Sequence, residues 1–175
     1  FNRGRHIQSL KVGHNLTDRI YVNGVFTRND FAGFFNNRKG KNHRVNDNLR
    51  GHQWLPKLQQ NTKALFFYKK EDFNFSYRFE YLNEGIERYA QNISMNENPS
   101  TNTTNPTALD EIYTNNRFYH HLNTVGTLFK AIDFNVSVSF QEQTKDIERF
   151  TYRIISQEKE NVEKAQYQSR RALFS

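Results

Sequence analysis

The sequence predicts an all-β fold, namely an antiparallel, up-and-down segment of a transmembrane β-barrel with about eight strands, short turns on one side and long loops on the other. Three observations lead to this fold class. Apolar and polar residues alternate in several segments, short and long connections alternate along the chain, and aromatic residues are abundant while aliphatic ones are scarce. We interpret all 175 residues as a fragment of a single barrel domain.

The alternation is strongest between Phe73 and Tyr81, where every second residue is aromatic and the residues between them are polar. Successive side chains of a β-strand point to opposite faces, so this segment has one apolar face and one polar face. The same alternation returns between Phe134 and Gln141. Two such strands indicate a sheet that separates water from an apolar medium, which is either a protein core or a lipid bilayer.

The composition favours lipid. Hydrophobic residues make up 35% of the chain, below the roughly 45–50% of soluble domains, whereas aromatic residues reach 15%. A barrel needs apolar residues only at alternate positions, so it tolerates such a composition. No run approaches the roughly 20 apolar residues of a spanning helix. The lack of cysteine excludes a disulfide framework and thiolate metal sites. The net charge of +7 fits contact with anionic lipid headgroups.

We expect the first four strands at residues 6–14, 19–29, 62–68 and 73–82, with tight turns at 15–18 and 69–72. A long polar stretch, 30–60, separates the second strand from the third. A second polar stretch covers 83–115, and its centre is almost pure Asn, Ser, Thr and Pro, which has little to bury. Within it, 107–113 is a candidate for one helical turn, because Asp110 follows Thr107 as in a capping box.

The remaining strands are expected at 117–129, 134–143, 147–155 and 167–174, with a charged excursion at 157–166. Strands of this length match the roughly 9–11 residues that cross a bilayer at a tilt. Loops longer than about 12–15 residues are uncommon in compact soluble domains, so the polar stretches 30–60 and 83–115 also favour a membrane barrel. The chain begins at Phe1 and stops within an apolar segment, so we expect it to be a piece of a longer protein.

Catalytic, metal and nucleic-acid sites are not predicted. His120 and His121 are neighbours that face opposite sides of a strand, so they cannot bind one ion together. No nucleophile motif or phosphate-binding glycine loop is present. Nucleic-acid binding requires aromatic and basic residues on one face, whereas Arg78 faces away from the aromatic row. We therefore predict no enzyme activity, no cofactor and no nucleic-acid partner.

Under the barrel interpretation, the polar parity of two strands lines the lumen. The candidate lumen-lining residues are Asn74, Ser76, Arg78, Glu80, Asn135, Ser137, Ser139 and Gln141. Ligand contacts are expected from the loops, near 39–44 or 96–105. Aromatic side chains with a polar tip suit the boundary between bilayer and water. The candidates for that boundary are Tyr68, Tyr81, Tyr119 and Tyr152.

Residues 65–73, followed by 75–84, resemble paired barrel strands of TonB-dependent outer-membrane receptors from the Bacteroidetes group, and 110–124 leading into 134–143 is similar in style. The resemblance is one of rhythm and composition, without a diagnostic motif. It implies a large barrel in the bacterial outer membrane, closed by the protein's own plug domain, that imports a scarce small nutrient with energy from the TonB complex. The implied partners are outer-membrane lipid, the plug, the TonB complex and the nutrient. The alternative is a secreted, soluble β-sandwich that binds carbohydrate by stacking Trp54 or exposed tyrosines on sugar rings.

Overall fold

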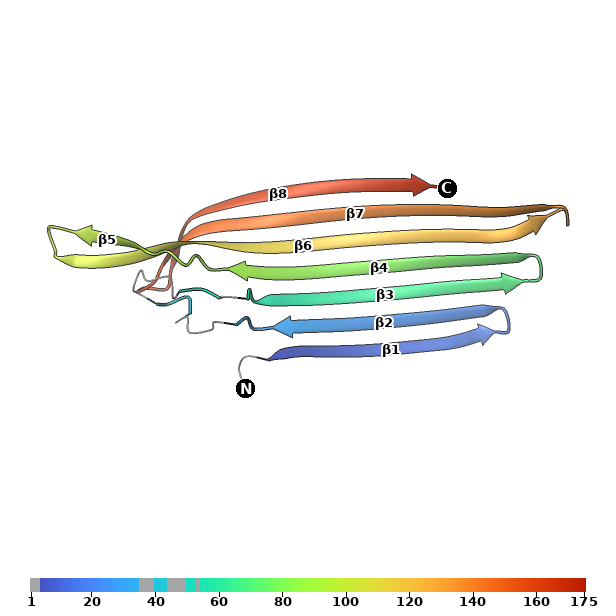
Figure 1. Ribbon diagram of the computed structural model, residues 1–175, viewed down its shortest axis with the longest axis horizontal. Helices are drawn as coiled ribbons and strands as arrows, with labels where there is room; N and C mark the ends of the chain where they lie inside the picture. Colours follow the sequence, from blue (N-terminus) through green and yellow to red (C-terminus); the bar gives the residue numbers. More distant parts are fainter. Residues whose placement is uncertain (1–3, 35–39, 44–49, 53) are drawn as a thin grey trace.

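The computed structural model describes residues 4–34, 40–43, 50–52 and 54–175, which form one long antiparallel sheet (Figure 1). The strands are β1 (Arg5–Thr17), β2 (Ile20–Phe31), β3 (Lys57–Lys70), β4 (Phe73–Arg88), β5 (Ser94–Asn98), β6 (Thr103–Leu128), β7 (Ile132–Arg153) and β8 (Lys159–Phe174). They lie side by side in the order β1-β2-β3-β4-β6-β7-β8, and β5 pairs with β6. This confirms the all-β, antiparallel, up-and-down prediction.

The connections differ between the two ends of the sheet. Two-residue turns at 18–19 and 71–72 and a three-residue turn at 129–131 lie at the end drawn on the right of Figure 1. The opposite end, which we call the loop side, carries the connections 32–56, 89–93 and 154–158 and the β5–β6 hairpin. The predicted short turns are therefore present at one end, and the longest connection lies at the other.

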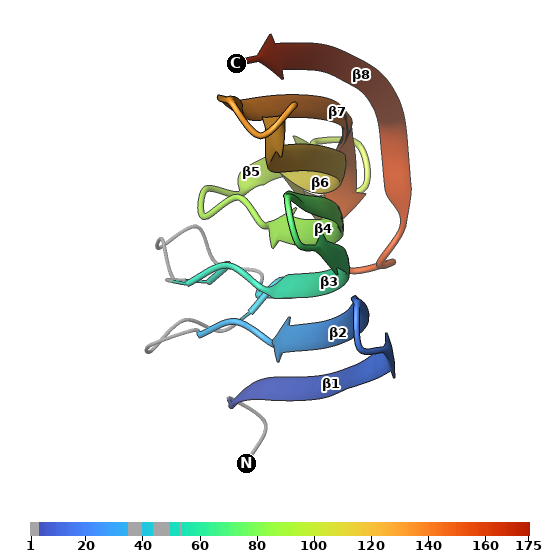
Figure 2. The same ribbon diagram turned by 90° about the vertical axis from the view of Figure 1, so that its right-hand side faces the viewer.

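The sheet does not close into a barrel. Strands β1 and β8 form its two edges, and the view along the strands places them at opposite extremes, together with the two ends of the chain (Figure 2). Each edge leaves alternate backbone N–H and C=O groups without a partner in the sheet. Among the described residues no helix is long and apolar enough to cross a membrane.

Three local predictions on the loop side were wrong. Residues 107–113 belong to strand β6 and form no helical turn. The predicted sixth and seventh strands are one continuous strand, β7, which runs for 22 residues. The charged segment 157–166 is no excursion, because β8 begins at Lys159 and pairs with β7 along most of its length. The count of eight strands is kept because β5 forms inside a stretch expected to be loop.

A small core lies on the loop side. Its buried members are Ile93, Ala108, Phe150, Tyr152 and Ile154. Strands β6 and β7 supply three of them from one face, since Ala108 pairs with Tyr152 across the ladder and Phe150 is the partner of Asp110. The rest of the sheet, as described, has no second layer packed on it, so large apolar side chains stay accessible along its length.

Candidate functional site

The register of the strands separates the side chains into an apolar face and a polar face. Phe79 of β4 pairs with Ala64 of β3 and with His120 of β6, which in turn pairs with Phe140 of β7. Side chains at paired positions share one face of a sheet. We call residues that are paired across the strands a row, and the end of the sheet with the short turns the turn side. Between the turn side and the middle of the sheet, this face carries the following apolar residues: Leu10, Val12, Ile20, Val22, Phe26, Ala64, Phe66, Tyr68, Phe73, Phe75, Tyr77, Phe79, Tyr81, Phe118, Leu122, Ile132, Phe134, Val136, Val138, Phe140, Ala172 and Phe174.

These residues form a continuous apolar band across seven strands. The band is about nine residues long on β4, from Phe73 to Tyr81, or roughly 26 Å at about 3.3 Å per residue. Its rings contact one another, as in the stacked pair Tyr81–Phe118, whose centroids lie 4.8 Å apart. Several of its polar groups are paired on the same face. The Tyr77 hydroxyl and His120 Nδ1 lie 2.7 Å apart, and the Tyr81 hydroxyl donates to Asn116 at 3.2 Å. In the row of Tyr81, Arg170 donates to Glu142 at 3.0 Å. Val136 stays 47% exposed and Leu10 64% exposed, so the described chain leaves the band uncovered.

All eight residues predicted to line a lumen lie together on the polar face. The four on β4 and the four on β7 stand in matching rows, separated only by one residue of β6. The rows are Asn74–Val125–Asn135, Ser76–Asn123–Ser137, Arg78–His121–Ser139 and Glu80–Tyr119–Gln141. The predicted strand pattern identified the outer members of each row. The β6 members follow from the same alternation read through residues 117–128.

Cross-strand interactions connect this polar face. Lys63 Nζ of β3 lies 3.6 Å from a carboxylate oxygen of Glu80, its register partner. His121 Nδ1 lies 2.9 Å from Ser139 Oγ, and the ring of Tyr119 stacks on that of His121 at an interplanar angle of 6°. Adjacent strands thus provide the partners of Glu80 and Ser139, whereas the buried Oδ1 of Asn74 accepts no hydrogen bond from the described residues.

Positive charge gathers on the polar face. Its basic side chains are Arg5, Lys11, Lys57, Lys63, Lys69, Arg78, Arg88, Arg117, Lys145, Arg149, Arg153 and Arg171. Its acidic side chains are Glu80, Glu84, Glu111, Asp133, Glu160 and Glu163. On the opposite face, the rows beyond the apolar band contain more acidic than basic residues. The positive charge of the described strands is therefore directed mainly to one side of the sheet.

A buried ion pair fastens the loop between β2 and β3 to the sheet. The Arg50 guanidinium is 0% exposed and donates from Nη1 and Nη2 to the two Asp110 carboxylate oxygens at 2.8 and 2.7 Å. Arg50 also donates to the carbonyl oxygens of Lys41 and Ala90 at 2.6 Å each. The Ala90 amide in turn donates to Asp110 at 3.0 Å. Bidentate, charge-assisted bonds of this kind are strong and fix the loop's position.

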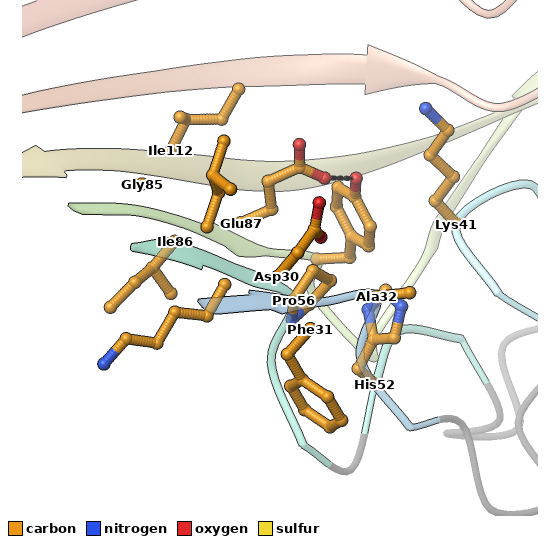
Figure 3. A pocket seen from close by; sticks show the side chains of 13 residues that line it. Asp30, Phe31, Ala32, Lys41, His52, Pro56, Gly85, Ile86, Glu87 and Ile112 are labelled. Atoms are coloured by element: carbon orange, nitrogen blue, oxygen red, sulfur yellow. Dashed lines mark hydrogen bonds between the residues drawn. The ribbon is translucent and has the colours of Figure 1, made fainter. Parts of the chain in front are cut away.

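Next to this pair, a cleft of about 650 Å³ opens on the loop side, above the apolar band (Figure 3). Its charged and titratable groups come from Asp30, Lys41, His52, Lys57, Glu87 and Tyr89. The carboxylates of Asp30 and Glu87 lie on the same side of the strands in Figure 3. Burial lowers the pKa of His52 to about 4, although nearby Glu87 opposes the shift. Burial and the hydrogen bond to Glu87 raise the pKa of the Tyr89 hydroxyl.

The other residues that the sequence singled out lie in several parts of the structure. Lys41 and His43 of the 39–44 cluster are described and Lys41 lines the cleft, while Lys39 and Arg44 lie outside the described residues. Residues 96–105 form the β5–β6 hairpin, away from the cleft. Tyr68 and Tyr81 lie in the apolar band, close to its two ends. Tyr119 lies on the polar face and Tyr152 is in the small core, so neither belongs to the apolar band.

His120 and His121 lie on opposite faces, as their adjacency in a strand requires. Across the described ranges, no three side chains of metal-binding type gather in one place. No family model matches the chain, and no curated protein or solved structure matches it either.

Proposed function

We propose that this chain is part of the wall of a β-barrel in the bacterial outer membrane, with its apolar face against lipid and its polar face toward the lumen. The observation that carries the proposal is the apolar band, which is continuous across the strands and ends in polar rows on the loop side. Because barrel strands are tilted by about 35–45°, its length of roughly 26 Å along β4 corresponds to a height of about 20 Å, which is most of the apolar belt of about 25 Å that outer-membrane barrels present to lipid. Aromatic residues such as Tyr68 and Tyr81 near its ends suit the two interfaces.

The asymmetry of the connections supports the same orientation. Outer-membrane barrels have short turns on the periplasmic side and longer loops outside the cell. In the proposed orientation the turn at 71–72 faces the periplasm, and the loop held by Arg50 and the β5–β6 hairpin face the exterior. The strand β6, with 26 residues, is longer than a crossing requires and would extend beyond the lipid on that side.

We further propose that the barrel is a TonB-dependent receptor that binds and imports a scarce small nutrient. This step is supported by the resemblance of the β3–β4 hairpin to barrel strands of those receptors. The plug domain and the TonB complex would be its partners, and its work would be binding and release rather than catalysis. The carbohydrate-binding sandwich is less well supported, because the described residues form one sheet and its apolar face has no protein layer over it.

The lipid contact is tested with a pair of tryptophan variants on one strand. Trp54 is the only tryptophan, so Trp54→Phe provides a dark background. In it, Phe140→Trp places the probe on the apolar face, and Gln141→Trp places it one residue away on the polar face. After the chain is incorporated into vesicles, we expect brominated acyl chains to quench the fluorescence of the Phe140→Trp variant strongly and that of the Gln141→Trp variant weakly. Equal quenching of the two, or a chain that folds cooperatively in buffer without lipid or detergent, would refute the proposal.

A further inference from the structure

The polar face contains cations that the fold leaves without counter-charges. Its central carboxylates are paired, Glu80 with Lys63, Glu84 with Lys57 and Glu111 with both Arg88 and Arg149. Among the other cations of this face, Arg78, Arg117, Lys145 and Arg171 lie on the neighbouring strands β4, β6, β7 and β8. None of these four makes an ion pair with any described carboxylate, since every acidic group near them is already engaged or lies on another row. We call them the unpaired cations.

The unpaired cations lie close together although they come from four strands. Arg171 shares a row with Gln141 and Tyr119, and Arg117 occupies the next row with Gln143. Arg78 and Lys145 lie in the rows on either side of these two. Neighbouring strands are about 4.8 Å apart, and successive rows on one face are about 7 Å apart. The four charges therefore fall within an area of about 14 Å across the strands and about 21 Å along them.

Their surroundings favour an anion rather than water alone. The Nε atom of Arg117 is buried and makes no hydrogen bond. Lys145 Nζ lies 4.9 Å from the centre of the Tyr113 ring, its one described interaction. A groove of about 530 Å³ is lined by Lys145, by Gln143, which is the row partner of Arg117, and by Tyr113 and Ile86. The ion-paired side chains of Glu84 and Arg88 also line it. A guanidinium with free N–H groups and an ammonium beside amide donors are the groups that bind phosphate and carboxylate.

We infer that the unpaired cations form a binding site for a small molecule with two or more anionic groups, such as phosphates or carboxylates. The inference deepens the proposed function by naming the charge of the ligand that the polar face receives, and it rests on that face being the ligand side. Like charges this close repel one another, so a multivalent anion that bridges them gains attraction and relieves repulsion at once. A ring of Lys and Arg is also the usual lining of pores that select anions.

Neighbouring arginines on β8 offer a matched test. Arg171 lies on the polar face with no carboxylate partner, whereas Arg170 points to the other face and donates to Glu142 at 3.0 Å. The full chain is folded in zwitterionic micelles, and its affinity for inositol hexakisphosphate is measured by calorimetry in about 0.15 M salt, a physiological ionic strength. We expect Arg171→Gln to weaken binding about threefold, as for a half-exposed ion pair, and Arg170→Gln to leave it unchanged.

The combined variant Arg78→Gln, Arg117→Gln, Lys145→Gln is expected to weaken binding about thirtyfold if the three contributions are equal and additive. Uncharged inositol should not bind, and a retained β-sheet spectrum confirms that each variant folds. Equal losses from Arg170→Gln and Arg171→Gln, or no binding of the polyanion by the unmodified chain, would overturn the inference. If brominated lipid quenches the Phe140→Trp variant but the polyanion does not bind, the anion-site inference alone is refuted. If the polyanion binds but lipid does not quench that variant, the barrel proposal alone is refuted.

Discussion

The buried pair Arg50–Asp110 is expected to control whether the loop between β2 and β3 stays docked on the sheet. Replacing Asp110 with Asn keeps the shape of the side chain but removes its charge. The Arg50 guanidinium, which is fully buried, then loses the carboxylate that accepts from both of its terminal nitrogens. The Asn side chain also has one oxygen rather than two, so it accepts fewer of the three bonds that now reach Asp110 from Arg50 and Ala90.

The magnitude follows from the burial of both partners, which are 0% and 1% exposed. Two unit charges about 4 Å apart attract by about 4 kcal/mol at an effective dielectric constant of 20. Removing one partner of a buried pair costs about 3–5 kcal/mol, because the remaining charge stays desolvated. Each 1.4 kcal/mol corresponds to a factor of ten, so local opening of the loop should become about a hundred-fold to several-thousand-fold more frequent.

Amide hydrogen exchange of Ala90 measures this opening, since its N–H donates directly to Asp110. We expect Asp110→Asn to accelerate exchange at Ala90 by that factor and to leave Phe79, in the middle of β4, unchanged. The double variant Arg50→Met, Asp110→Leu serves as the control, because replacing a buried pair by apolar side chains of similar size recovers most of the loss. Unchanged exchange at Ala90 in Asp110→Asn would show that the ion pair does not hold the loop.

Two further predictions concern the same loop. With the loop docked, the pKa of His52 is about 4, below its ordinary value of 6.5. Between these pH values the open state therefore binds more protons than the docked state. Docking should weaken as the pH falls from 6.5 to 4, by about 3 kcal/mol at most. Ala90 exchange, corrected for its intrinsic pH dependence, should show this loss, and His52→Gln should abolish it. Gly51 has φ +85°, and a Cβ there would lie 2.6 Å from the Tyr89 carbonyl oxygen. We therefore expect Gly51→Ala to destabilise docking of the loop by about 1–3 kcal/mol. Gly24→Ala is the control, because a Cβ at Gly24 meets open space and should not change docking.

The sequence was sufficient to predict the strands within the apolar band. In those strands, the alternation of aromatic and polar residues predicts that a strand forms and also which face each side chain occupies. Residues 73–82, for example, were predicted as a strand and form the first part of β4. The predicted polar residues Ser76 and Ser137 accordingly fall in one row, with Asn123 between them.

The loop side could not be predicted in this way, because both faces are polar there and the alternation disappears. The strand character of residues 103–116 comes from ladders with β4, β5 and β7, which are interactions between distant parts of the chain. Asp110 shows the difficulty. Its spacing from Thr107 fits a helix cap, yet its partner is Arg50, 60 residues away in the sequence. Local propensity carries little weight when such contacts decide the conformation.

The two faces also constrain how the sheet can meet lipid. A basic residue facing lipid near the midplane of a barrel costs about 2–4 kcal/mol, and the polar face carries Arg78 and Lys63 at the depth of Phe79. If the polar face were turned to the bilayer, this cost would arise at each such basic residue. The apolar face would at the same time lose its contact with lipid and be exposed to water. The positive charge, which the sequence alone led us to match with lipid headgroups, is in this orientation directed mainly into the lumen. One alternation along the strands thus both selects the lipid-facing side and concentrates the cations where a soluble anion would meet them.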